Sequence, residues 1–154
     1  MYLADVKDFY LGLFQKEWDL SQKGRHLYVV KSTVKPWSHA GGNDPWLVIL
    51  SQLRMGWDAL ARTEFRKDNV KSPECPCGAP VEDRDHFLIS CPCYADQRQQ
   101  LRDSLPLSVD SSSVVDLLGG GNYSLDVQLT ISKLVCEFVK NSGRFVLGSR
   151  WQFS

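Results

Sequence analysis

The sequence predicts a small, mostly α-helical domain organised around one cluster of cysteine and histidine residues. Apolar residues recur at helical spacing in several stretches, and glycine or proline residues separate these stretches. Three thiols and one imidazole fall within residues 75–91. With 154 residues, the chain is long enough to bury one core. We therefore expect a single domain over residues 1–154.

Residues 1–70 are predicted to form a helical N-terminal part. Apolar side chains recur every three or four positions from Val6 to Trp18, which predicts an amphipathic helix that ends at Gly24. Residues 26–33 are rich in β-branched side chains. We expect a short extended segment there.

The next helix is predicted to begin at residues 43–45, Asn-Asp-Pro. Asn and Asp cap helix starts, and proline is tolerated at the first helical position because no amide donor is needed there. Residues 46–53 supply the apolar face. The helix either ends at Gly56 or continues to about Lys67.

The remaining helices follow a knuckle segment, which occupies residues 71–94. Helices are predicted over residues 95–104, 111–118 and 125–140, and together they make up a C-terminal part over residues 95–154. Serine side chains and glycines mark several of their ends.

The knuckle segment contains Cys75, Cys77, His86 and Cys91, at intervals of one, eight and four residues. Thiolate sulfur and imidazole nitrogen are the ligands that zinc prefers, and four of them close a tetrahedral structural site. The sequence therefore predicts a zinc knuckle with these four ligands and Zn²⁺ as the cofactor. Cys93 is an alternative to Cys91 as the fourth ligand, and buried thiols around a core histidine are the alternative to a metal site.

Other residues of these types are predicted to have no ligand role. Cys136 lies inside a predicted helix and is expected to be a buried, small apolar side chain. His26 and His39 have no cysteine or carboxylate neighbours at ligand spacing. The acidic residues between the ligands are interpreted as a solvated loop that repels phosphates, and the alternative is that one of them orients His86; they are Glu82, Asp83 and Asp85.

Binding to nucleic acid, if it occurs, must be local, because eighteen basic and eighteen acidic residues cancel over the whole chain. Residues 20–43 are basic and interleaved with aromatic residues, a composition that can follow a phosphate backbone and stack on bases. The alternative is that the aromatic residues are core and the lysines are ordinary surface. The predicted contacts are Lys23, Arg25, Tyr28, Lys31 and Lys35, with Arg54, Arg62, Arg66, Lys67 and Lys71 as a second group.

Several short motifs, in their order and spacing, resemble the carboxy-terminal region of non-LTR (LINE-type) retrotransposon reverse transcriptases. The resemblance covers nearly the whole chain. The residues that carry it are Trp18, Gly24-Arg25, Tyr28, Trp37, Leu50-Ser-Gln-Leu53-Arg54-Met-Gly56, Cys75-Pro-Cys77-Gly78, His86-Phe-Leu-Ile-Ser-Cys91-Pro92, Tyr94, Arg98 and Phe138-Val-Lys-Asn-Ser-Gly143-Arg144-Phe145.

The resemblance implies a zinc-binding knuckle that helps to handle element RNA and target DNA, with Cys75, Cys77, His86 and Cys91 as the ligands. The expected partner is RNA or DNA, and the alternative is a protein-interaction or scaffold role in which zinc is purely structural. Neither a membrane nor a small-molecule substrate is expected. Because the chain begins at Met1 without a polymerase, we expect either an excised domain or a free-standing derivative.

No catalytic activity is expected. Catalytic zinc keeps one position open for water, whereas four close ligands leave none. The sequence also lacks a phosphate-binding glycine loop and a deaminase signature. The charged start carries no apolar run, and the odd number of cysteines favours a reducing compartment. We therefore expect the nucleus or the cytoplasm.

Overall fold

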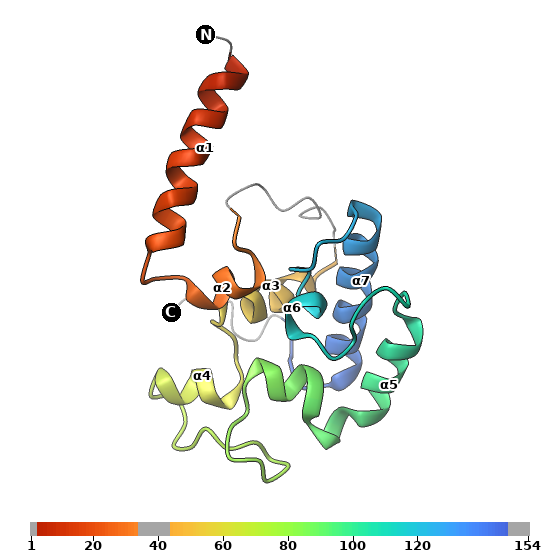
Figure 1. Ribbon diagram of the computed structural model, residues 1–154. Coiled ribbons are helices and arrows are strands. Elements are labelled where there is room, and N and C mark those ends of the chain that lie inside the picture. Colours follow the sequence, from red (N-terminus) through yellow and green to blue (C-terminus); the bar gives the residue numbers. More distant parts are fainter. Residues whose placement is uncertain (1–2, 34–43, 148–154) are drawn as a thin grey trace.

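The structure is a computed structural model that describes residues 3–33 and 44–147 (Figure 1). Within these ranges the chain forms helices and no strand, so the predicted mostly helical fold class is confirmed. None of the described helices has both the length and the apolar character needed to cross a membrane. The described elements are α1 (Leu3–Leu20), α2 (Arg25–Val30), α3 (Leu47–Met55), α4 (Ala61–Arg66), η1 (His86–Ser90), η2 (Pro92–Tyr94), α5 (Ala95–Ser104), α6 (Val114–Leu117) and α7 (Leu125–Ser142).

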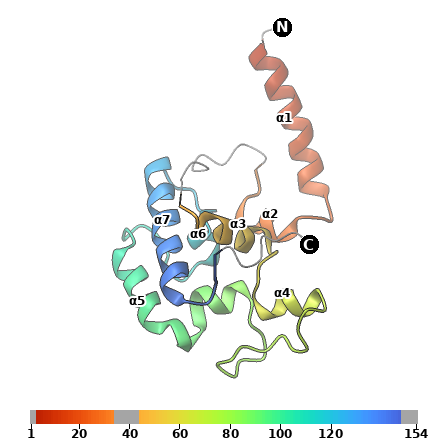
Figure 2. The ribbon, with the colours of Figure 1, turned by 180° about the vertical axis from the view of Figure 1, so that it is seen from behind.

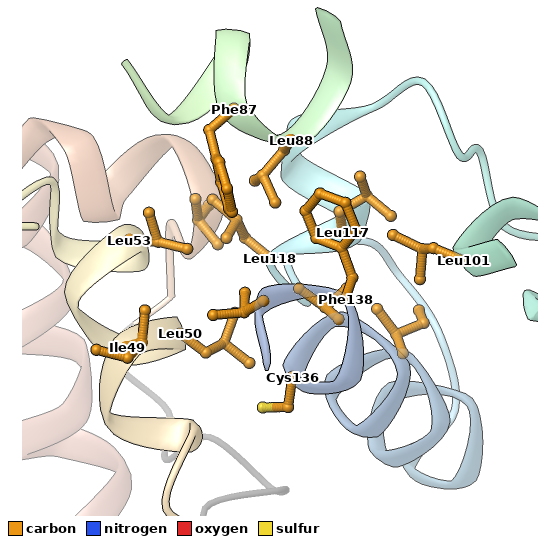
Figure 3. Packing of buried hydrophobic residues seen from close by; sticks show 14 of the residues in the cluster. Ile49, Leu50, Leu53, Phe87, Leu88, Leu101, Leu117, Leu118, Cys136 and Phe138 are labelled. Atoms are coloured by element: carbon orange, nitrogen blue, oxygen red, sulfur yellow. The ribbon is translucent and has the colours of Figure 1, made fainter. Parts of the chain in front are cut away.

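The core lies between α3, α5, α6, α7 and the knuckle (Figure 3). The knuckle helix η1 contributes Phe87 and Leu88, which are both fully buried. The ring of Phe87 lies 5.3 Å from that of Phe138 on α7 and 5.2 Å from that of Tyr94. These distances suit aromatic pairs, which stabilise a core beyond their buried area. The knuckle is therefore built into the main core and is not a separate appendage.

Residues 26–33 do not form the extended segment that was predicted. Arg25–Val30 form α2 instead, and extended backbone begins only at Lys31, with φ −141° and ψ 90°. Val30 is buried, and its carbonyl oxygen would lie 2.0 Å from a Cβ atom at Gly120. The prediction is wrong because packing against the core overrides the strand preference of β-branched residues.

Gly56 ends α3, so α3 and α4 are separate helices. Gly56 has φ 70°, in the left-handed region that favours glycine at helix ends. A Cβ atom at this position would also lie 2.6 Å from a ring carbon of His26. Glycine thus allows both the turn and the close approach of α2.

Helix α1 projects away from the core (Figures 1 and 2). It has no buried residue. Its last turns are linked to the domain by Trp18 Nε1, which donates to the carbonyl of Lys31 at 3.2 Å, and by the Gln15 amide, which donates to the carbonyl of Ser32 at 2.7 Å. Large apolar side chains of α1 are exposed, and they are Leu3, Phe9, Tyr10, Leu13, Phe14 and Leu20.

Candidate functional site

A tight turn carries the first two predicted ligands. The N–H of Cys75 donates to the carbonyl of Ala79 at 3.0 Å, and the N–H of Gly78 donates to the carbonyl of Cys75 at 2.9 Å. Gly78 has φ 96°, which other residues rarely adopt, although space for a side chain exists there. Glycine at this position lets the turn close between Cys75 and Cys77.

The wide helical turn η1 carries the other two ligands, with His86 at its start and Cys91 directly after its end. Helix ends leave backbone carbonyls without partners. Here Arg98, which is 5% exposed, donates to the carbonyls of Phe87, Leu88 and Cys91 at 3.0, 2.9 and 2.9 Å. Arg98 therefore fixes the segment that positions His86 and Cys91.

The four predicted ligands converge. Their ligand atoms all lie within 4.8 Å of one another. The sulfurs of Cys75 and Cys91 are 3.7 Å apart, and the sulfur of Cys77 is 3.3 Å from His86 Nε2. Tetrahedral zinc with Zn–S bonds of ~2.3 Å separates two sulfurs by ~3.8 Å, and sulfur from nitrogen by ~3.6 Å. The donor atoms and their spacing thus fit a tetrahedral metal ion.

The ligand thiols differ in their surroundings. Burial raises the pKa of Cys75 and raises that of Cys91 to about 12. The backbone N–H of Ala79 lowers the pKa of Cys77. Because thiolates are the metal-binding form, a metal ion must displace protons from Cys75 and Cys91 when it binds.

A buried ion pair lies against the ligands. Glu82 is 1% exposed, and Arg144 donates to its two carboxylate oxygens at 3.0 and 2.6 Å. The N–H of Ala61 donates to the same carboxylate at 2.8 Å, and the sulfur of Cys75 lies 3.8 Å from it. Burial raises the pKa of Glu82, but the hydrogen bonds from Arg144 and Ala61 outweigh burial and lower it. The interpretation of Glu82 as a solvated residue is therefore wrong.

The other acidic residues of this segment lie closer to the surface. Asp83 accepts the backbone N–H of His86 at 2.8 Å and pairs with Arg62 at 3.3 Å. The side chain of Asp85 is 66% exposed and lies 3.7 Å from Arg84 Nε. Asp83 thus positions His86 through its backbone.

The remaining thiols and imidazoles lie outside the ligand group. Cys93 is exposed, and only Cys91 of this pair is among the converging atoms. Cys136 is buried in α7, as predicted, and burial raises its pKa to about 12. His26 packs against Gly56, and His39 lies outside the described residues.

Comparison with known proteins gives one match to a retroelement protein. The chain is similar to the "Retrovirus-related Pol polyprotein from type-1 retrotransposable element R1" of Bradysia coprophila. The two sequences are 30% identical over 91 residues, which is 57% of this chain and 9% of the polyprotein. No model of a known protein family matches the chain, and no solved structure matches it.

The first group of predicted nucleic-acid contacts is largely engaged within the protein. Arg25 stacks over the ring of Tyr28 at 4.1 Å and donates to the carbonyl of Trp18. The hydroxyl of Tyr28 donates to Asp19 at 3.0 Å, and Lys31 Nζ donates to the carbonyl of Thr33 at 2.6 Å. Of this group, Lys23 is exposed and Lys35 lies outside the described residues.

Arg25 and Tyr28 also belong to the motifs that carry the family resemblance. Arg25 lies 5.2 Å from the ring of Trp18, and a Cβ atom at Gly24 would lie 2.8 Å from that ring. These four residues form one stacked unit that joins α1 to α2. The contacts of Trp18, Arg25 and Tyr28 thus hold the end of α1 against α2.

The prediction of Arg54 as a nucleic-acid contact is wrong. Arg54 is 7% exposed in the core, where it donates to the carbonyl of Leu118 at 2.8 Å and to the hydroxyl of Ser132 at 3.2 Å. A guanidinium without such partners would not be buried. Arg62 and Arg66, by contrast, are exposed on α4, as a contact with nucleic acid requires.

Sequence reasoning missed the residues that support the ligands. Arg98 and Arg144 both fall within the motifs of the resemblance, and this was the available signal for them. Nothing in the spacing indicated the ion pair between Glu82 and Arg144, which lies 62 residues further along the chain.

Proposed function

We propose that the chain is a non-catalytic, zinc-binding module that binds RNA or DNA and corresponds to the C-terminal region of a non-LTR retrotransposon reverse transcriptase. The observation that carries this proposal is the convergence of Cys75, Cys77, His86 and Cys91 in a chain that is similar to a retrotransposon polyprotein. The similarity extends to 9% of that polyprotein, so its other activities are not transferred to this chain.

Zinc is proposed as the metal because three sulfurs and one imidazole nitrogen at these separations match its preferred ligands and geometry. A structural role is proposed because four protein ligands leave no open position for water or substrate. Free cysteines, with both Cys75 and Cys91 buried beside the core, favour the reducing environment of the nucleus or cytoplasm.

The proposed nucleic-acid surface includes Arg62 and Arg66 on α4, with Lys23 near the start of α2. All three residues are exposed. Arginine side chains bind phosphates through charge-assisted hydrogen bonds. Since the whole chain has no net charge, we expect moderate affinity that depends strongly on salt.

The direct test is binding to labelled single-stranded RNA and to duplex DNA at about 50 mM and about 200 mM salt. We expect binding that weakens at the higher salt concentration. The triple variant Lys23→Gln, Arg62→Gln and Arg66→Gln should bind more weakly and with a smaller salt dependence. A folded, zinc-loaded protein that binds neither nucleic acid at low salt would refute this function.

A second candidate function, contact with a protein partner, is favoured by α1. An 18-residue helix with no buried residue and six exposed large apolar side chains is unusual in a soluble chain. Isolated helices of this length are only marginally stable in water, so a partner would stabilise α1.

The variant Phe9→Glu with Leu13→Glu tests this second function. The control is Leu107→Glu, which also places a charge on an exposed leucine but lies outside α1. A protein that co-purifies with the wild type and with Leu107→Glu, but not with the α1 variant, would support docking on α1. Equal recovery with all three proteins would exclude it.

A further inference from the structure

A cavity of about 110 Å³ opens beside the knuckle. It lies between α2, the end of α3, α4 and the loop that precedes His86, so it gathers residues that are far apart in the sequence. Three arginines and one histidine form much of its lining, and they are Arg62, Arg66, Arg84 and His26.

Three carboxylates also line this cavity, but each has partners within the protein. Asp58 is buried and accepts a backbone N–H at 3.0 Å. Asp83 accepts a backbone N–H at 2.8 Å and pairs with Arg62 at 3.3 Å. Asp85 lies 3.7 Å from Arg84. Much of the negative charge at the cavity is therefore already engaged.

Arg84 has a structural role in the wall of the cavity. Its guanidinium donates to the carbonyls of Leu53, Arg54 and His26 at 3.0, 3.1 and 3.2 Å, and so ties the end of α3 to α2. These bonds fix the position of the guanidinium, whose Nε also lies 3.7 Å from Asp85. The charge of Arg84 is therefore partly balanced, and Arg84 shapes the wall of the cavity.

Arg66 is the cation that is available to a ligand. It is exposed, and within residues 3–33 and 44–147 its side chain has no hydrogen bond or ion pair. Arg62 uses one of its N–H groups with Asp83 and keeps others for a second acceptor. Burial lowers the pKa of His26 most, the charges of Arg84, Arg66 and Arg62 lower it further, and the charge of Asp58 raises it.

We propose that this cavity is a subsite for one backbone phosphate of a nucleic acid, bound by Arg66 and Arg62. The planar guanidinium presents parallel N–H groups that match phosphate oxygens, and two arginines at positions i and i+4 of one helix face the same cavity. The inference rests on the proposed nucleic-acid function and assigns the position at which α4 contacts the phosphate backbone.

The test compares Arg66→Gln with Arg102→Gln in the full chain. Arg102 is also exposed but lies on α5, on the other side of the molecule from α4 (Figure 1). We measure the salt dependence of binding to single-stranded RNA and the chemical shifts of arginine Nε–H groups during titration with inorganic phosphate. The salt slope is the slope of the logarithm of the binding constant against the logarithm of the salt concentration. Arg66→Gln should reduce the magnitude of this slope by about 0.7 and weaken binding to all sequences, while Arg102→Gln leaves both unchanged.

The two measurements separate failure of the subsite from failure of the function. If the wild type binds RNA and Arg66→Gln keeps its salt slope, the subsite is refuted while nucleic-acid binding stands. If phosphate shifts the Arg66 resonance but neither RNA nor DNA binds, the ligand is a free phosphate, and both the subsite and the proposed function are overturned. The proposal is supported if Arg66→Gln has a smaller salt slope than the wild type and if phosphate changes the chemical shift of the Arg66 Nε–H group in a saturable way.

Discussion

Replacing Arg144 with methionine should destabilise the protein strongly, because it leaves a buried carboxylate without its cation. Glu82 is 1% exposed, and Arg144 donates to both of its oxygens at 2.6 and 3.0 Å. Among the described residues, the backbone N–H of Ala61 would still donate to a carboxylate oxygen of Glu82, at 2.8 Å. Removing one partner of a buried ion pair costs about 3–5 kcal/mol, and we expect Arg144→Met to lie in this range.

The reciprocal variant Glu82→Gln should lower the free energy of unfolding less than Arg144→Met does, by about 1–3 kcal/mol. The amide keeps an acceptor for the N–H of Ala61. The Arg144 side chain is 28% exposed and also donates to the carbonyl of Ala59 at 3.3 Å, so water can solvate its charge. The double variant removes both charges, and its cost should fall below the sum of the single costs by about 1–3 kcal/mol.

The assay is urea denaturation of the four proteins in buffer with excess zinc, followed by circular dichroism, with the slope m checked for constancy. Arg102→Met is the control for loss of an exposed arginine and should change the unfolding free energy by less than about 0.5 kcal/mol. Additive single costs, or an Arg144→Met protein as stable as the wild type, would show that Glu82 and Arg144 do not act as a buried pair.

Three further predictions follow from the geometry. Arg98→Met removes three hydrogen bonds to carbonyls behind η1, of which that of Cys91 keeps the N–H of Tyr94 as a donor, so the variant should lower the free energy of unfolding by about 3 kcal/mol and weaken zinc binding about 10–100-fold, as measured by competition with a chelator. Iodoacetamide near pH 8 should modify Cys93 in the zinc-loaded protein, whereas Cys136, with its pKa raised to about 12, should react only after unfolding; modification of Cys136 in the native protein would contradict its burial. Burial lowers the pKa of His26, so the unfolded chain binds more protons there, and stability should fall as the pH drops from about 7.5 to about 5.5. His26→Gln should show a shallower fall, and an identical fall in both proteins would exclude this contribution.

Features that depend on local sequence were the ones that could be predicted. The helices at residues 95–104 and 125–140 follow from apolar periodicity and nearby helix-ending residues, and the structure has α5 over 95–104 and α7 over 125–142. The convergence of the four ligands follows from their short separations and from the turn at Gly78. Both kinds of signal act over a few residues.

The placement of basic residues could not be predicted in the same way. Arg54 is buried because Leu118 and Ser132, 64 and 78 residues away, supply its acceptors. Arg25 is held by a ring stack that forms only when α1 and α2 meet. A basic side chain has the same appearance in a sequence whether it contacts water, a phosphate or a distant carbonyl, and only the fold distinguishes these cases.

The wrong prediction of an extended segment at residues 26–33, where the structure has α2, has the same origin. His-Leu-Tyr-Val-Val is suited to a strand, yet no neighbouring strand exists among the described residues to pair with it. The buried position of Val30 against Gly120 and the N-terminal left-handed Gly24 favour a helical turn instead. Strand preference requires a partner, and the sequence contains no information on whether the fold provides one.

The central claim, that Cys75, Cys77, His86 and Cys91 hold zinc, is tested most directly by the zinc content of purified proteins. The wild type should contain about one equivalent of zinc, and Cys75→Ser should lose it and unfold more easily, since structural zinc binding is coupled to folding. Cys93→Ser and Cys136→Ser are matched controls and should retain zinc, because both residues lie outside the converging group. Equal zinc content in the wild type and in Cys75→Ser would contradict the assignment.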